Sequence, residues 1–191
     1  MKKLLSICLL FILSLTVNAQ GFSKSEMKDL KKEAKKYEKE GWKTMPGAMS
    51  LTDQLALSKK LTLEEDEEGN TKWQIGAATS VGSIYDAARM QTMTLAKAEL
   101  TSLITSLITS NYIAASENKQ ISQDEAESFV KASMESEGIS VDQKLGNPRV
   151  IFDAYRKLSN GNVEVTIRIA ILQKKVKEIA NELFYAVNDN N

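Results

Sequence analysis

One segment decides the fold: residues 83–111 read SIYDAARMQTMTLAKAELTSLITSLITSN. Apolar residues recur along this segment at helical spacing, which predicts one long central helix. Ser83 and Asp86 fit a capping box, in which the Ser83 hydroxyl accepts an unpaired backbone N–H and Asp86 lies in the electropositive first turn. We therefore expect the central helix to begin at Ser83.

Projected at about 100° per residue, the central helix carries two apolar stripes on roughly opposite sides. Two stripes imply two neighbours, because a helix that covers one face of a sheet needs a single stripe. We expect a sheet on one side of residues 84–98 and other helices on the other side. The first stripe comprises Met93, Ala96, Leu100, Leu103, Ile104 and Leu107, and the second comprises Ile84, Ala87, Ala88, Leu95 and Ala98.

A four-residue unit, Thr-Ser-Leu-Ile, occurs at residues 101–104 and again at residues 105–108. This repeat is a candidate interaction edge that would dock a partner helix, although an ordinary core-facing stripe is the more common outcome. The residues of this candidate edge are Leu103, Ile104, Leu107 and Ile108.

The N-terminus matches a cleaved secretory signal peptide covering residues 1–19. Two lysines precede the apolar run 4–17, and a small-x-small cleavage site ends at Ala19, directly before Gln20. The apolar run is shorter than the ~20 residues that a membrane span needs. We expect an exported, soluble chain in the periplasm or outside the cell, with no stable membrane insertion after cleavage.

Charge and residue types exclude several functions. The chain has 25 basic and 25 acidic side chains, and removal of Lys2 and Lys3 leaves 23 basic ones, so the mature chain carries a net charge near −2. Nothing in this balance indicates nucleic-acid binding. The chain has no histidine, and its one cysteine, Cys8, lies in the signal peptide. Ser-His-Asp and Cys-His nucleophilic sites and Cys or His zinc sites are therefore excluded, and no cofactor is expected.

The N-terminal part of the mature chain, residues 20–69, is predicted to form a helical pair followed by an acidic turn. The first helix covers Ser25 to Glu40, and the second begins with a capping box at Ser50 and ends near Leu61. We expect these two helices to pack on the central helix. The acidic run 64–70 resembles a calcium loop, but Ile75 occupies the position of the bidentate carboxylate, so a solvated turn is favoured.

A strand over residues 72–81 and a hairpin around Asn160-Gly161 are predicted to supply the sheet. In the strand, alternation places Trp73, Ile75, Ala77 and Val81 on one side. A two-residue type I′ loop gives the hairpin one apolar face and one face of opposite charges. The predicted pairs are Ala154 with Ile167 and Phe152 with Ile169 on the first face, and Lys157 with Glu164 and Asp153 with Arg168 on the second.

The remaining segments complete the predicted fold. Ser122 caps a helix that ends at Gly138, residues 139–144 are interpreted as a further strand, and residues 172–187 carry the apolar spacing of a C-terminal helix. Residues 188–191 form a polar tail. The expected class is α+β: a long central helix packed on a small antiparallel sheet, with the N-terminal helical pair and the C-terminal helix added, and residues 70–187 as the main domain.

A family resemblance covers residues 70–172. It is carried by the strand from Trp73 to Gly82, by the alanine-rich helix with Ala87, Ala88, Ala96-Lys97 and Glu99-Leu100, and by Val163-Glu164-Val165. This region resembles the LPP-type small lipoprotein antigens of Gram-negative envelopes and the N-terminal domain of flagellar outer-membrane assembly proteins. The resemblance implies an α+β envelope protein without catalytic residues. The chain departs from the lipoproteins by lacking their lipid-modified cysteine, as a non-lipidated exported member would.

The function expected from these features is that of a non-enzymatic envelope module that binds another envelope protein or itself, as a homo-oligomer. The alternative is a small-ligand or glycan binder with a groove between helices and sheet, lined by Trp42, Trp73 or Arg89. Arg89 is the candidate contact for an anionic ligand, although it could instead extend its head group to water. A third hypothesis is a carboxylate enzyme that uses Asp86, Asp153 and Glu164.

Overall fold

The computed structural model describes residues 21–116, 121–138 and 140–188. The predicted signal peptide, with its cleavage site at Ala19 and Gln20, and residues 189–191 of the predicted tail lie outside these ranges. The described elements are α2 (Lys24–Lys39), α3 (Leu51–Leu63), β1 (Trp73–Gly82), α4 (Tyr85–Ala115), α5 (Gln123–Ser136), α6 (Val141–Leu145), β2 (Arg149–Lys157), β3 (Val163–Leu172) and α7 (Gln173–Asn188).

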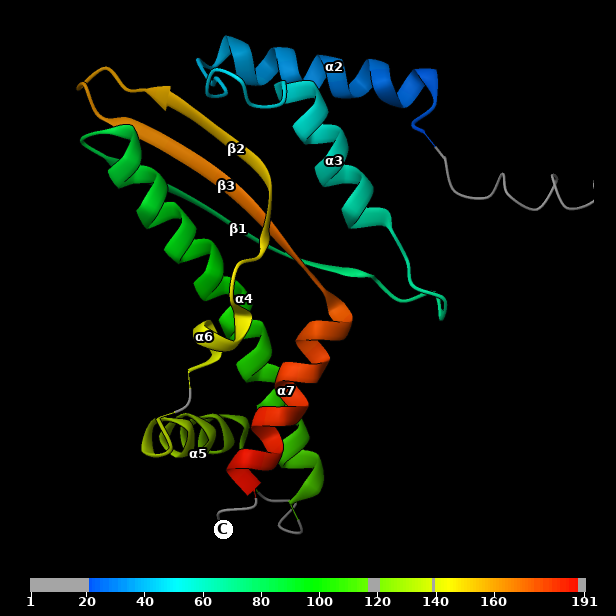
Figure 1. The fold of residues 1–191 in the computed structure, drawn as a ribbon, viewed down its shortest axis with the longest axis vertical. Coiled ribbons are helices and arrows are strands. Elements are labelled where there is room, and N and C mark those ends of the chain that lie inside the picture. The colour runs from blue at the N-terminus through cyan, green and yellow to red at the C-terminus, as the bar shows by residue number, and fades with distance from the viewer. Residues whose placement is uncertain (1–20, 117–120, 139, 189–191) are drawn as a thin grey trace, which may run out of the picture.

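The α+β class is confirmed, with the long helix α4 packed on a three-stranded antiparallel sheet of strand order β1-β3-β2 (Figure 1). The second half of α4 runs beyond the sheet and packs against α5, α6 and α7. None of the described helices is long and apolar enough to cross a lipid bilayer.

The N-terminal helices α2 and α3 cover the face of the sheet opposite to α4 (Figure 1). The prediction that they pack on the central helix is therefore wrong. The reason lies in the hairpin strands, which bury side chains on both faces. Val165 and Ile167 are buried in the core shared with α4, whereas Phe152 and Ala154 are buried against α2 and α3.

The contact between β1 and α4 is unusually close because β1 presents small residues to the helix. A Cβ added to Gly76 would lie 2.4 Å from the Ala96 carbonyl oxygen, and one added to Gly82 would lie 2.7 Å from the Ala88 nitrogen. Only residues without a Cβ allow the backbones to approach this closely. The predicted side of β1 therefore faces away from α4, and of its residues Ala77 and Val81 are exposed.

Two buried hydroxyls join β1, α4 and β3. The Ser80 Oγ donates to the Ala88 carbonyl oxygen over 2.9 Å and lies 2.6 Å from the Thr92 Oγ1. The Thr92 Oγ1 in turn lies 2.8 Å from the Ala88 carbonyl oxygen and 3.2 Å from that of Val165 in β3. Both side chains are buried, so these bonds satisfy polar groups that would otherwise be costly in the core.

Helix α4 differs from its prediction at its start and in its apolar stripes. Gly82 remains in the strand and against Ala88, so the helix begins at Tyr85, with Ile84 as its N-cap and no side-chain capping bond. The predicted capping box at Ser83 is wrong. The first predicted stripe is buried at Ala96, Leu100 and Ile104 and partly buried at Met93 and Leu107. The buried residues of α4 are Ala88, Thr92, Ala96, Leu100, Ile104, Thr105, Ile108 and Thr109.

The second predicted stripe, over the first half of the helix, is wrong, because four of its five residues are exposed and Ala88 alone of the five is buried. The two neighbours of α4 follow one another along the helix instead of lying on opposite sides. The sheet contacts the first half, and α5 and α7 contact the second half (Figure 1).

The hairpin turns through three residues, not two. The Leu158 N–H donates to the Asn162 carbonyl oxygen over 2.8 Å, and the Gly161 N–H donates to the Leu158 carbonyl oxygen over 3.0 Å, with Gly161 at a φ of 85°. Such a loop is a turn followed by one left-handed residue, and it shifts the register by one position.

The shifted register replaces all four predicted pairs. Ala154 lies opposite Thr166, Phe152 opposite Arg168, Asp153 opposite Ile167 and Lys157 opposite Val163, with a bulge between Val150 and Phe152. Glu164 pairs instead with Arg156, over 2.6 Å. The strand predicted over residues 139–144 is also wrong, because residues 141–145 form helix α6.

The predicted helix caps at Ser50 and Ser122 are confirmed. Ser122 forms a reciprocal capping box with Glu125, and the Ser50 Oγ accepts the Asp53 N–H. A further capping box, which the sequence analysis did not predict, joins Ser23 and Glu26, so the first helix begins at Lys24 and not at Ser25. The acidic run 64–70 is a turn in which the Asp66 carboxylate accepts two backbone N–H groups, from residues 68 and 70.

Replacing Gly76 with alanine tests the close contact between β1 and α4. The new Cβ would meet the backbone of Ala96, which cannot move without shifting α4. We expect Gly76→Ala to lower the free energy of unfolding by roughly 1–3 kcal/mol in urea denaturation. Gly21→Ala is the control, because a Cβ there has no neighbour within 4 Å. Equal stability of Gly76→Ala and the parent chain would contradict this packing.

Candidate functional site

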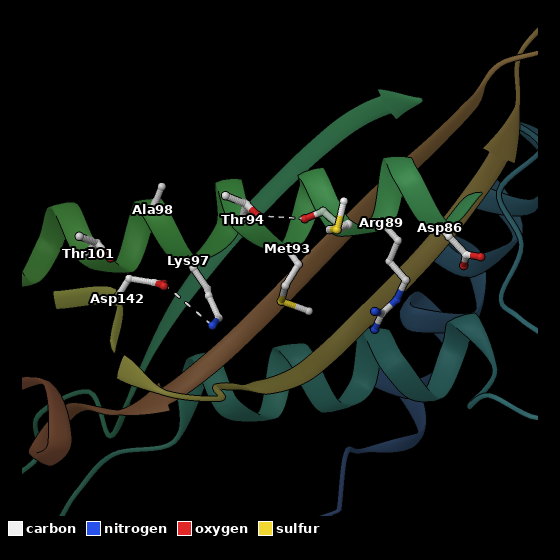
Figure 2. A pocket seen from close by; sticks show the side chains of 9 residues that line it. Asp86, Arg89, Met93, Thr94, Lys97, Ala98, Thr101 and Asp142 are labelled. Carbon is white, nitrogen blue, oxygen red and sulfur yellow. Dashed lines mark hydrogen bonds and ion pairs between the residues drawn. The ribbon is translucent and has the colours of Figure 1, made fainter. Parts of the chain in front are cut away.

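An open groove runs along one side of α4, with a volume of about 660 Å³. Arg89, Met93 and Lys97 follow at four-residue spacing, and Figure 2 shows the three side chains extending from the same side of the helix. We call this the α4 groove. Its lining residues are Asp86, Arg89, Met90, Met93, Thr94, Lys97, Ala98, Thr101 and Asp142.

Arg89, the predicted ligand contact, is already paired. Its Nε donates to the Asp153 Oδ2 over 2.7 Å, and the Tyr85 hydroxyl donates to the Asp153 Oδ1 over 3.3 Å. The Asp153 backbone N–H donates to the Gln54 Oε1 of α3 over 2.6 Å. These bonds fasten the start of α4 to β2, so a structural role accounts for Arg89 without a ligand.

The pairing changes the ionisation of two groups. The hydrogen bond to Asp153 raises the pKa of Arg89, against the effect of burial. Burial raises the pKa of Tyr85, and the negative charge of Asp153 raises it further. The neutral phenol of Tyr85 is therefore favoured in the folded state. This contribution to stability is complete below the ordinary tyrosine pKa of 10 and is lost as the pH rises through the raised value.

The other end of the α4 groove is less firmly paired. The Lys97 Nζ lies 3.9 Å from the Asp142 Oδ1 of α6, which is at the outer limit of an ion pair (Figure 2). Between the two cations, Met93 lines the groove and Met90 is 72% exposed. The centre of the groove is therefore apolar and its two ends are charged. Methionine side chains are flexible and can adapt to ligands of different shape.

The predicted aromatic residues do not line the groove with Arg89. Trp42 is buried against α2 and α3 on the opposite side of the sheet, where the Arg156 guanidinium lies 4.6 Å from the centroid of its ring. The Trp73 Nε1 donates to Glu64 over 3.0 Å, and its ring packs with residues of α3. Of the three residues expected to line a ligand groove, Arg89 therefore lies in the α4 groove and the two tryptophans lie elsewhere.

The predicted edge at residues 103–108 is divided between core and surface. Ile104 and Ile108 are fully buried, Leu107 packs partly buried against the same core, and Leu103 is 39% exposed. A continuous exposed edge of these four residues is therefore wrong, and the core-facing interpretation holds for Ile104 and Ile108.

The three candidate catalytic carboxylates do not all lie together, because Glu164 is on the opposite side of the sheet from Asp153. Asp153 contacts Tyr85 and Arg89 on the α4 side of the sheet, whereas Glu164 binds Arg156 on the side of Trp42. Asp86 lines the α4 groove. Across the described ranges, no group of three or more acidic, histidine or cysteine side chains is placed to hold a metal ion.

The outer edge of β1 is a feature that the sequence interpretation missed. The Ala77 N–H points away from β3 and donates to the Glu99 Oε2 over 2.5 Å. Backbone groups alternate in direction along a strand, so the N–H groups of Thr79 and Val81 also point outward. Within the described part of the chain, neither has a hydrogen-bond partner. The signal was available, because WQIGAATSVG contains no charged residue and no proline.

Exposed apolar side chains of α4 border this open edge. Leu95, Glu99 and Leu103 follow at four-residue spacing, and Glu99 reaches Ala77, so this row lies beside β1. Leu95 is 45% exposed and Val81 is 42% exposed. We define the β1 edge surface as Ala77, Thr79, Val81, Leu95, Glu99 and Leu103.

The opposite edge of the sheet is covered. Tyr155 of β2 exchanges two backbone hydrogen bonds with Lys43, over 2.7 and 2.8 Å. The Asp153 N–H is bound by Gln54. The backbone of β2 is therefore less available to an added strand than the backbone of β1.

No protein-family model matches this chain, and neither a curated protein nor a solved structure matches it.

Replacing Asp153 with asparagine tests the Tyr85–Asp153–Arg89 arrangement. The substitution removes the negative charge beside Tyr85 and leaves the positive charge of Arg89, so we expect the pKa of Tyr85 to fall. Absorbance titration of tyrosinate measures this change, and Tyr85→Phe identifies the signal of Tyr85 among the five tyrosines. Asp142→Asn, which removes a carboxylate bound to Lys97 instead, should leave that pKa unchanged. An unaltered Tyr85 titration in Asp153→Asn would refute the arrangement.

Proposed function

We propose that this chain is an exported, non-enzymatic protein of the cell envelope that binds another envelope protein, or a second copy of itself, through the β1 edge surface. The observation that carries the proposal is the open, uncharged edge of β1 beside exposed leucines of α4. The resemblance to envelope lipoprotein antigens supports the same compartment and a role without catalysis.

The edge offers two kinds of contact to a partner in extended conformation. Outward backbone groups of Thr79 and Val81 can pair with an added strand, which supplies affinity through main-chain hydrogen bonds. The exposed row on α4 supplies apolar area and one charge, Glu99. An added strand would have to displace the Glu99 carboxylate from the Ala77 N–H. Glu99 therefore favours a partner that places a cation or a donor at this position.

Support for a non-enzymatic role comes from the carboxylates. Asp153 and Glu164 are each bound to an arginine and lie on different sides of the sheet. A pair of carboxylates on either side of one substrate bond, as glycoside hydrolysis requires, is not formed by these two residues.

The second candidate function is the binding of a small ligand or glycan fragment in the α4 groove. Its volume of about 660 Å³ falls within the roughly 300–1,000 Å³ typical of ligand sites. Lys97 is only loosely paired and is available to an anionic group. A ligand that binds only the folded chain raises the midpoint of thermal unfolding, so a panel of cell-wall fragments tests this alternative.

A lysine at position 79 tests the edge directly. Thr79 is exposed and its side chain makes no hydrogen bond in the described structure, so we expect Thr79→Lys to fold normally. The new lysine places a charge on the edge strand, and such a charge opposes pairing with an added strand. We expect loss of the partner, or of the dimer, by at least about tenfold in affinity, since one buried unpaired charge costs more than 1.4 kcal/mol. The measurement is affinity capture from crosslinked envelopes together with light scattering of the purified chain.

Thr94→Lys is the matched control, because it makes the same change on an exposed position of α4 away from β1. It should retain the partner. Binding that survives Thr79→Lys but is lost in Thr94→Lys would move the interface to the α4 groove and contradict the proposal.

A further inference from the structure

A second, smaller pocket lies on the other side of the sheet, between α2 and α3, with a volume of about 260 Å³. We call it the α2/α3 pocket. Three leucines line it together with two hydroxyl residues and three charged ones, one of which is an arginine of the central strand β3. The lining residues are Leu30, Glu33, Leu55, Ser58, Lys59, Thr62, Leu63 and Arg168.

Arg168 is held in place by neutral groups alone. Its Nη1 donates to the Ser58 Oγ over 3.0 Å, and its Nη2 donates to the Tyr37 hydroxyl over 3.4 Å. The guanidinium carbon lies 4.9 Å from the centroid of the Phe152 ring. The guanidinium is therefore fixed in orientation, although none of these partners neutralises its charge.

This arrangement differs from that of the other partly buried arginines. Arg89 is paired with Asp153 over 2.7 Å, and Arg156 is paired with Glu164 over 2.6 Å. Arg168 forms no ion pair with any carboxylate of the described residues. Glu33 lines the same pocket but is exposed and makes no ion pair with Arg168.

Arg168 is the cation of this pocket that has no carboxylate partner among the described residues. Lys59, the other cation of the lining, is already paired, because its Nζ lies 3.6 Å from the Glu26 Oε1. Withdrawing a cation from water without a counter-charge costs free energy, and the cost is recovered when an anion binds. A guanidinium that is already oriented loses little entropy on binding a planar carboxylate or a phosphate.

We propose that the α2/α3 pocket is a binding site for a small amphipathic oxyanion. Its carboxylate or phosphate group pairs with Arg168, and its short apolar chain lies against Leu30, Leu55 and Leu63. Ser58 and Tyr37 act as positioning residues that hold the guanidinium. This site shares no residue with the β1 edge surface, so a test of anion binding here does not depend on whether the proposed partner exists.

Calorimetric titration of the full chain tests the site with four probes. Hexanoate and hexyl phosphate carry both the anionic head and the apolar chain, hexan-1-ol carries only the chain, and inorganic phosphate carries only the head. We expect hexanoate or hexyl phosphate to bind more tightly than the two partial probes. The tighter of the two identifies the head group. Failure of both to bind at millimolar concentration, or equal binding of hexan-1-ol, would overturn the proposal.

Substitution at Arg168 assigns the binding to this pocket. Arg168→Gln should weaken binding of the anionic probe about tenfold or more, because it removes the charged hydrogen bonds between the guanidinium and the anion. Arg156→Gln is the matched control: it removes an arginine from the same face of the sheet, but one that is paired and does not line the pocket. Equal weakening in both variants, or none in Arg168→Gln, would refute the assignment.

A second variant keeps the test decisive if Arg168→Gln does not fold. Leu63 is 63% exposed at the pocket, so Leu63→Asp should fold normally and place a negative charge beside the anion. We expect the anionic probe to lose more affinity than hexan-1-ol, because both probes lose the contact with Leu63 but only the anion is repelled by the new charge. Unchanged anion binding in Leu63→Asp would count against the site.

Discussion

The close contact between β1 and α4 is the constraint on which the rest of the structure depends. Gly76 and Gly82 bring the strand backbone against Ala96 and Ala88, and the Ser80–Thr92 hydroxyl pair closes the contact with hydrogen bonds. Because the strand places its small residues toward the helix, its larger residues face the opposite side. Both faces of the sheet are then covered, one by α4 and the other by α2 and α3 (Figure 1).

This arrangement also decides where binding surfaces can form. With both faces covered, contacts with other molecules are left to the strand edges and to the sides of the helices. The β2 edge is bound by Lys43 and Gln54, whereas among the described residues Glu99 alone binds the outer edge of β1. The two pockets lie on different sides of the sheet. Arg89 in the α4 groove has a carboxylate partner, and Arg168 in the α2/α3 pocket has none in the described part of the chain.

Several features could be predicted from the sequence because a few adjacent residues determine them. The caps at Ser50 and Ser122, the strand before the central helix and the turn at Gly161 are local, and all are present. The start of α4 could not be predicted, because Gly82 contacts Ala88 across the turn. The hairpin register depended on whether the loop had two residues or three. The sites were harder to predict than the fold. Arg89 could be singled out from the sequence, but its partner Asp153 lies 64 positions away. The α2/α3 pocket around Arg168 is formed by α2, α3 and β3 together, so no single segment predicts its charges.

The central claim is that β1 leaves an open edge in the isolated chain. Amide hydrogen exchange measured by NMR, at a dilution where the chain is monomeric, tests it residue by residue. The account predicts rapid exchange at Thr79 and Val81, whose N–H groups point outward, and strong protection at Ala78 and Ser80, which face β3. Equal protection at all four amides would mean that the edge is already covered, and the proposed binding surface would not exist.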